Sequence, residues 1–204
     1  MEGGLKGVLC NASALDLVTC GGISGLPEAF GRSSWGGLPS LKLLTITSCD
    51  EITKLIRGQN IRGSMLPNLK RLVINRLRNL ETILDGMVPN RVSLGRLKTI
   101  EVVDCPRLKV VISYGLLQQI QNLEEIRHIE VSNCPMLKQL PLSVCNAATI
   151  TEIRGEIEWW SNLRWKDENI KSTFNNVFRH AQTLKLAEKD KWDLYADQKN
   201  GEQS

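Results

Sequence analysis

Cysteine is the residue of this sequence most able to do chemistry, and most of its copies recur in one slot of a repeat. The slot is filled by Cys20, Cys49, Cys105 and Cys134. A catalytic thiol needs a positioned base, and neither His128 nor His180 falls in register beside one. The sequence has no C-x-x-C pair of the kind that holds zinc. We therefore expect reduced thiols, four or five of the six pointing inward; a pair such as Cys20 and Cys49 comes close without forming a disulfide.

Basic side chains recur in a second slot, which we call the basic stripe: Lys42, Lys70, Lys98 and Arg127. Like charges on neighbouring strands repel, so one interpretation is a surface that meets an acidic partner. The other is a solvated strand edge, relieved by nearby glutamates, because long lysine side chains spread apart in water. The sequence alone leaves both open.

Signatures of cofactor, nucleotide and metal sites do not occur in the sequence. We find no G-x-x-x-x-G-K-[ST] phosphate loop, no G-x-G-x-x-G and no H-E-x-x-H. The net charge of +4 is mild, and no stretch approaches the roughly 20 apolar residues of a membrane helix. We expect no enzyme activity, no cofactor or metal and no membrane insertion. With no recognisable signal peptide, we expect a cytoplasmic protein, with nuclear entry open.

The element that positions these residues is a repeat of 28–29 residues. Residues 97–111 read LKTIEVVDCPRLKVV, which follows the leucine-rich-repeat pattern L-x-x-L-x-L-x-x-C-x-x-L. The equivalents of Val102 are spaced by 29, 28, 28 and 29 residues, at Leu17, Ile46, Ile74 and Val131. Five copies in phase predict an α/β solenoid: a curved stack with a parallel sheet on its concave face, and loops and short helical turns on its convex face.

The stacked strands predict a concave face made of the positions outside the consensus. Rows of mixed charge and size suit a protein partner. We expect the basic stripe to contact this partner together with six further residues: Thr45, Val73, Glu101, Glu130, Asn75 and Arg76.

The chain divides into four segments in this interpretation. Residues 1–11 form an eroded N-terminal edge; 12–153 form the solenoid, with five clear repeats and an imperfect sixth around Ile150 and Ile153. Residues 154–180 form a Trp-rich cap followed by a helix, and 181–204 a solvated tail. We expect the helix to start with Ser172 as its N-cap and to carry Phe174, Val177 and Phe178 on one face. Trp159 and Trp160 suit cap packing, with a stacking platform for nucleic acid as the alternative.

The repeats and the cap together resemble one family. The units LPNLKRLVI, LKTIEVVDCPRLKVV and IRHIEVSNCPMLKQLP, and the ending IRGEIEWWSNLRWKDENIKS, look like the C-terminal repeats of plant disease-resistance proteins of the coiled-coil, nucleotide-binding, leucine-rich-repeat class. The resemblance covers roughly residues 5–180 and does not include the nucleotide-binding module. It implies a recognition module of an intracellular immune receptor. Its partners would be a pathogen effector, a guarded host protein or a nucleotide-binding module.

Two alternatives remain at this point. One is a regulatory or adaptor repeat protein with another partner, for which an F-box-like segment before the repeats would be a sign. The other is a weak nucleic-acid binder that uses the basic stripe, which a steep fall of affinity with salt would reveal.

Overall fold

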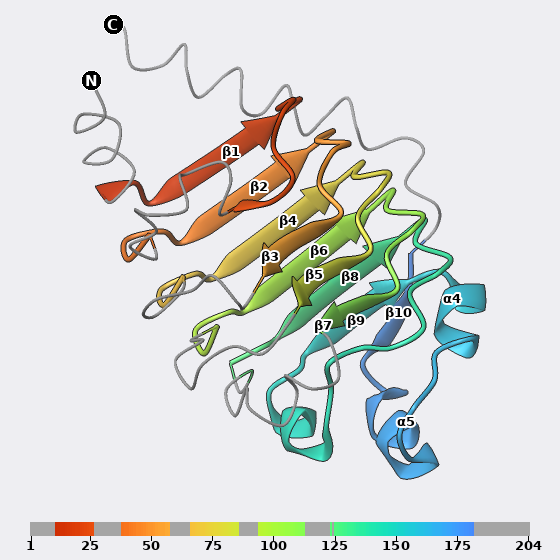
Figure 1. Ribbon diagram of the computed structural model, residues 1–204. Coiled ribbons are helices and arrows are strands. Elements are labelled where there is room, and N and C mark those ends of the chain that lie inside the picture. The colour runs from red at the N-terminus through yellow and green to blue at the C-terminus, as the bar shows by residue number, and fades with distance from the viewer. Residues whose placement is uncertain are drawn as a thin grey trace, which may run out of the picture.

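The chain forms a coil of parallel strands (Figure 1). A computed structural model describes residues 11–26, 38–57, 66–85, 94–112, 123 and 125–181. The larger sheet has seven strands in the order β1-β2-β4-β6-β8-β9-β10. Their bounds are β1 Ala14–Val18, β2 Leu43–Thr47, β4 Arg71–Asn75, β6 Thr99–Val103, β8 His128–Ser132, β9 Glu152–Gly155 and β10 Phe178–His180.

The repeat predicted from the sequence is confirmed by the strand register. Leu17 pairs with Ile46, and the same row continues through Ile74, Val102 and Val131. Alternate residues of each strand point into the stack, because side chains of a strand project to opposite faces. Ile46, Ile74 and Val102 are fully buried, so each coil covers the apolar edge of the next.

The side of the coil opposite the seven-stranded sheet carries a second, three-stranded parallel sheet. Its strands are β3 Lys54–Arg57, β5 Thr82–Asp85 and β7 Val110–Ile112. The sequence interpretation placed loops or helical turns here, because apolar residues recur every third position. Thr82, Ile83 and Val110 favour an extended backbone, and pairing between coils outweighs the three-residue spacing. The short helix suggested by GLLQQIQ, residues 115–121, lies outside the described residues.

In the first five repeats, each strand of the seven-stranded sheet is followed directly by a residue with left-handed backbone geometry. Their φ angles lie between 49° and 56°, at Thr19, Ser48, Arg76, Asp104 and Asn133. Non-glycine residues adopt this region at some cost. The first four are held there by a hydrogen bond of 3.0 Å from their N–H to a carbonyl oxygen of the next coil, on Thr47, Asn75, Val103 and Ser132.

Glu156 ends this series of hydrogen bonds. The N–H of Asn133 donates to Oε1 of Glu156 at 2.8 Å and not, among the described residues, to a carbonyl oxygen of a following coil; the Ser132 hydroxyl donates to the same Oε1 at 2.9 Å. Glu156 precedes helix α4, Ile157–Ser161, and its own extended backbone is typical of an N-cap position. One side-chain carboxylate therefore takes the place of a peptide group at the end of the stack.

The cap is built from aromatic rings, as the sequence indicated. Trp159 and Trp160 are 6% and 7% exposed, and Nε1 of Trp159 donates to the Leu137 carbonyl oxygen at 3.0 Å. Trp160 stacks on Phe178 with ring centroids 4.5 Å apart and meets Trp165 edge-on at 5.3 Å. Burial of both rings in the cap leaves no exposed stacking platform at these two tryptophans.

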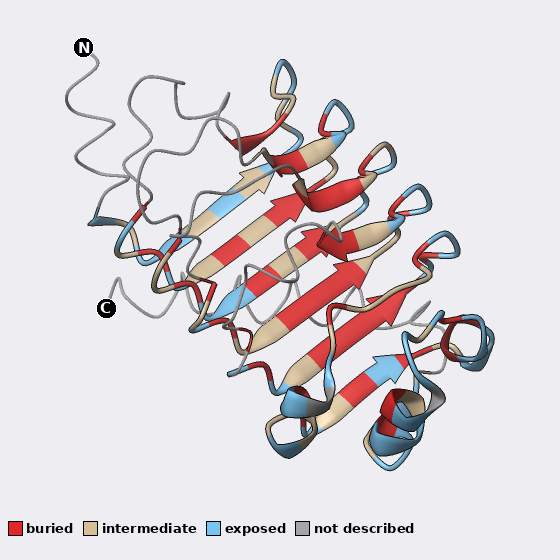
Figure 2. Ribbon diagram, turned by 60° about the horizontal axis from the view of Figure 1, so that its bottom comes forward, coloured by how far each residue is buried: buried red, intermediate tan, exposed pale blue. Residues whose placement is uncertain are grey.

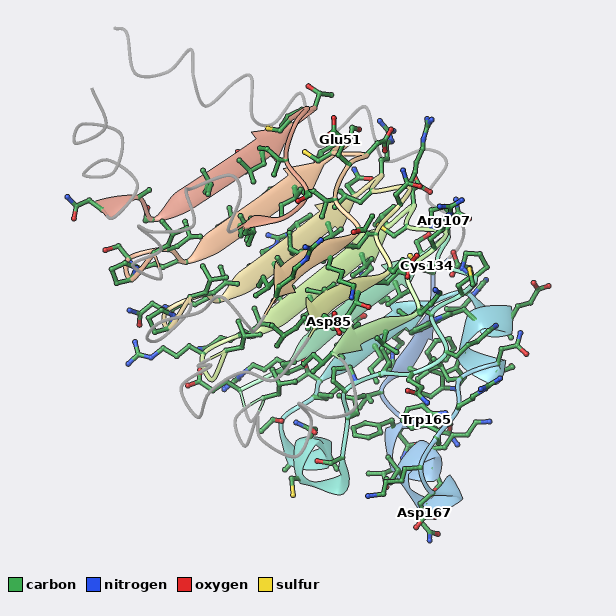
Figure 3. All side chains as sticks on the ribbon, viewed as in Figure 1. Glu51, Asp85, Arg107, Cys134, Trp165 and Asp167 are labelled. Atoms are coloured by element: carbon green, nitrogen blue, oxygen red, sulfur yellow. The ribbon has the colours of Figure 1, made fainter. Side chains whose placement is uncertain are left out.

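The predicted terminal helix is wrong in its position. Helix α5 runs from Glu168 to Phe174, and the Asp167 side chain accepts from the Asn169 N–H at its start (Figure 3). Ser172 lies inside the helix, and Phe178 begins strand β10, which pairs in parallel with β9. Pairing with an open sheet edge, and stacking of Phe178 on Trp160, outweigh the helical spacing of the apolar residues.

Burial is strongest in the middle of the coil (Figure 2). Leu44, Ile74 and Val102 are fully buried, whereas Leu17 in β1 is only partly covered. Strand β1 alternates between exposed and half-buried residues. The first described coil therefore has less apolar cover than the coils that follow it.

Candidate recognition face

The solvent-facing side of the seven-stranded sheet carries most of the residues predicted to contact a partner. The basic stripe lies in register just before the strands. The Lys70 N–H donates to the Lys42 carbonyl oxygen at 2.8 Å, and the same step joins Lys98 to Lys70 and Arg127 to Lys98. This pattern places the four cations side by side along one edge of the face.

The basic stripe is mostly open to solvent. Lys42, Lys70 and Arg127 are exposed, and Lys98 is half-buried. Nζ of Lys98 lies 3.7 Å from Oε2 of Glu125, an exposed pair of small energetic value. This geometry fits a solvated edge and a contact surface equally well.

The central row of the face runs through Thr45, Val73, Glu101 and Glu130, as predicted, and continues to Arg154. Its two glutamates are 8% and 9% exposed although they lie on the face and not in the core. Adjacent carboxylates repel when their strands pair, so neighbouring cations must compensate them.

A row missed by the sequence interpretation supplies one such cation, Arg71. It lies two residues before the central row and consists of Leu43, Arg71, Thr99, His128 and Glu152. Nη2 of Arg71 lies 2.7 Å from Oε1 of Glu101. The sequence signal was present in the two-residue alternation of the strand, but two outward positions separate the inward Leu41 from Leu44. The spacing does not show whether the row of Lys42 or the row of Leu43 lies on the exposed face of the strands.

His128 connects the glutamates of the last coils. Its Nδ1 lies 3.1 Å from Oε2 of Glu152, and its Nε2 lies 3.8 Å from Oε2 of Glu130. Arg154 donates from Nε to Oε1 of Glu152 at 2.7 Å. This hydrogen bond and the charge of Glu152 raise the pKa of Arg154. The face thus changes along its length, from Leu43, Thr45 and Val73 to a charged network in coils four to six.

Asn75 and Arg76 lie at the far edge of the face, where the strands end. Arg76 belongs to the left-handed row, and its Nε lies 3.9 Å from Oδ2 of Asp104. A shallow polar pocket of about 480 Å³ runs along this edge, lined by Ser48, Asp50, Arg76, Arg78, Asp104, Pro106 and Asn133. Oδ1 of Asn75 is buried and has no hydrogen-bond partner among the residues that the structure describes. An acceptor in this state costs free energy until a donor reaches it.

Three of the described thiols lie inside the coil. Among the residues that the structure describes, Cys20, Cys49, Cys105, Cys134 and Cys145 are all free thiols. Cys49, Cys105 and Cys134 are buried, as expected from the repeat, and Cys145 is exposed. Burial raises the pKa of Cys49, and a hydrogen bond with Cys105 together with burial raises that of Cys134. In the described ranges, no group of three His, Cys, Asp or Glu side chains is arranged to hold a metal ion.

No helix in the described part of the chain combines the length and apolar character needed to cross a membrane.

Comparisons with known proteins agree with the coil. Residues 38–149 match the family described as plant disease resistance protein RPS2-like, leucine-rich repeats. A disease resistance protein of Arabidopsis thaliana is 25% identical over 149 residues, which are 73% of this chain. The chain spans 14% of the length of that relative. No solved structure matches the chain.

The match to the family covers more than half of the 204 residues, and the coil has the architecture of a leucine-rich-repeat solenoid. The chain therefore belongs to the leucine-rich-repeat family of RPS2-like plant disease resistance proteins.

Proposed function

We propose that this chain is the protein-recognition module of an intracellular plant immune receptor. It acts by binding a pathogen effector, a host protein or a nucleotide-binding module through the exposed face of its seven-stranded sheet, without catalysis or a cofactor. The observation that carries the proposal is the face itself. Five paired strands, β1, β2, β4, β6 and β8, present outward rows in unbroken register.

The character of the face supports a protein partner. Leu43, Thr45 and Val73 form a half-buried, weakly polar part in β2 and β4. Beside it lies the charged network of Glu101, Glu130 and Glu152 with Arg71, His128 and Arg154. Protein interfaces combine such apolar and charged areas, whereas a phosphate backbone favours a continuous basic surface.

The basic stripe is the part of the face that we propose to set the orientation of the partner. Charges at the rim of an interface mainly change the association rate and its salt dependence. Lys70, Lys98 and Arg127 are therefore the residues to reverse in sign. Lys70 and Arg127 are exposed and Lys98 is half-buried, so we expect a variant with all three changed to Glu to keep its fold.

The experiment compares partners that co-purify from plant tissue with the wild type and with a variant carrying Lys70→Glu, Lys98→Glu and Arg127→Glu. A matched control carries Lys109→Glu, Arg164→Glu and Lys166→Glu, three exposed cations outside the face. We expect the stripe variant to lose a protein that the wild type and the control both retain. Identical partners in all three samples would show that the stripe is not a contact surface.

Filter binding to RNA and DNA at two salt concentrations distinguishes the nucleic-acid alternative. We expect no retention at physiological salt. Retention that falls steeply with salt and is lost in the stripe variant would favour nucleic acid over protein as the partner.

A further inference from the structure

Two pairs of free cysteines lie in neighbouring coils, at the turn that follows each strand. Cys20 follows β1 and Cys49 follows β2; Cys105 and Cys134 hold the equivalent positions after β6 and β8. The Cys20 N–H donates to Sγ of Cys49 at 3.4 Å, and Sγ of Cys20 donates to the Val18 carbonyl oxygen at 3.6 Å. Both sulfur atoms therefore lie at the same junction between the first two coils.

The register of the coils suits a covalent link at this junction. Thr19 still donates to the Thr47 carbonyl oxygen at 3.0 Å, so the coils remain paired up to the residue before Cys20. Paired strands lie about 4.7–4.9 Å apart, and disulfides join Cα atoms roughly 4.4–6.8 Å apart. The general spacing of paired strands falls within the disulfide range, so we expect a bond between the two sulfurs to form without separation of the coils.

Exposure distinguishes the first pair from the second. Cys20 is partly exposed, whereas Cys49, Cys105 and Cys134 are 0%, 0% and 2% exposed. We therefore expect a reagent in solution to reach Cys20 in the folded protein before it reaches either member of the second pair. Cys49 lies directly beneath the accessible thiol, where its own Sγ meets the Leu17 and Thr47 carbonyl oxygens at 3.8 and 3.4 Å.

We infer that Cys20 and Cys49 form a thiol–disulfide exchange site that closes into a cross-link between the first two coils. The co-reactant is a low-molecular-weight disulfide such as oxidised glutathione. The Cys20 thiolate attacks one of its sulfurs, forms a mixed disulfide and releases one glutathione thiolate. Cys49 then loses its proton and attacks Sγ of Cys20, and the second glutathione leaves. Two protein thiols are oxidised and one small disulfide is reduced to two thiols.

Burial assigns the order of the two steps. Attack requires a thiolate that the reagent can reach, and only Cys20 of this pair has solvent access. Burial raises the pKa of the Cys49 thiol, so this residue acts second, when the sulfur of Cys20 is already oxidised. The product joins β1 to β2 at the end of the coil where apolar cover is thinnest.

The test uses oxidised glutathione and the whole chain in a background with Cys10→Ser and Cys145→Ser. We expect the intact mass to fall by two hydrogens without a retained glutathione, a tryptic map to show a peptide joined through Cys20 and Cys49, and the melting temperature to rise. A reductant should reverse all three. The Cys49→Ser variant should instead retain one glutathione on Cys20, because the second attack is removed.

Two further variants complete the test. Cys20→Ser should show neither adduct nor cross-link, and Cys134→Ser should behave like the background protein; circular dichroism checks that each variant is folded. A stable glutathione adduct on Cys20 in the protein that retains Cys49 would overturn the inference. So would equally fast cross-linking of Cys105 to Cys134.

Discussion

Single residues show how a repeat tolerates polar atoms in its interior. The thiol of Cys49 donates to the Thr47 carbonyl oxygen at 3.4 Å, and Cys134 donates to that of Ser132 at 3.2 Å. In the coils that carry a cysteine in this slot, a small weak donor therefore meets a strand-end carbonyl without the desolvation cost of a stronger polar group. The consequence is a side chain that is stable in its neutral form and costly to ionise.

Alkaline pH should weaken the fold through Cys49. Its pKa is raised in the folded protein by burial, so its contribution is complete below the unfolded thiol pKa of roughly 8.5 and is lost as pH rises toward the folded value. We expect the free energy of unfolding to fall by up to ~1.4 kcal/mol per pH unit in this window on account of this thiol. Urea unfolding in reductant from pH 7.5 to 10 measures the loss. Cys49→Ser should reduce the slope, and the exposed-site control Cys145→Ser should leave it unchanged.

Gly155 is the residue where side-chain size matters most in the cap. A Cβ there would lie 2.4 Å from Cε3 of Trp159 and 3.1 Å from the Val131 carbonyl oxygen. Gly155→Ala should displace the ring and break its bond to Leu137, at a cost of about 1–3 kcal/mol. Urea unfolding followed by tryptophan fluorescence checks this. Gly21→Ala is the control, since its Cβ would approach no closer than 3.7 Å to Glu51, and a loss as large in the control would contradict the steric argument.

At the scale of elements, the fold depends on hydrogen bonds between each coil and the next. The N–H of each left-handed residue after a strand, such as Ser48 or Arg76, donates to a carbonyl oxygen of the next coil. In the last of these coils the acceptor is the Glu156 carboxylate. Helix α4 and the rings of Trp159 and Trp160 then cover the exposed apolar edge. The end of the coil is thus covered by a hydrogen-bonding carboxylate and by buried aromatic rings.

Removing the Glu156 carboxylate should destabilise this closure. Glu156→Ala leaves the Ser132 hydroxyl and the Asn133 N–H without their acceptor, and because Ser132 is buried, its unpaired hydroxyl costs about 1–3 kcal/mol. Glu156→Gln keeps an acceptor oxygen and should lose less. Thermal unfolding of both variants, beside Glu158→Ala on the exposed side of α4, measures the difference. Equal losses in the alanine and glutamine variants would show that charge, and not the hydrogen bond, closes the coil.

The sequence predicts the inward elements better than the outward ones. The row from Leu17 to Val131 follows from spacing alone, since burial repeats with every coil. The row of Arg71 and His128 does not, because two adjacent outward positions are equivalent until the strand boundary is known. Strand β10 is hidden for another reason: Phe174, Val177 and Phe178 have helical spacing, and only contact with β9 and Trp160 selects a strand. The role of Glu156 likewise needs the three-dimensional position of Asn133.

Across the whole molecule, stability is distributed along one dimension. Each coil contacts its neighbours, so a substitution is felt according to the number of coils that cover it. Ile74 lies between two complete coils and is fully buried, whereas Leu17 occupies the same row in the partly covered first coil. The same side-chain truncation should have different costs at the two positions.

Ile74→Ala should cost about 2–5 kcal/mol, the range for a fully buried aliphatic side chain. Leu17→Ala should cost distinctly less, because part of that side chain already contacts water. Chemical denaturation of the two variants provides the comparison, with hydrogen exchange of β1 and β4 as a second measurement. A larger loss at Leu17 than at Ile74 would contradict the order of burial along the coil.

The closing segment contacts the coil immediately before it: Glu156 bonds Ser132 and Asn133, Trp159 bonds Leu137, and the Arg164 N–H donates to the Lys138 carbonyl oxygen at 2.7 Å. These hydrogen bonds do not depend on the number of coils that precede that one. Duplication or loss of a whole 28-residue unit would therefore lengthen or shorten the exposed face of the sheet, and the same closing segment would still fit its end. If the exposed face binds a partner as we propose, such a change would alter the length of that face without requiring a new closing segment.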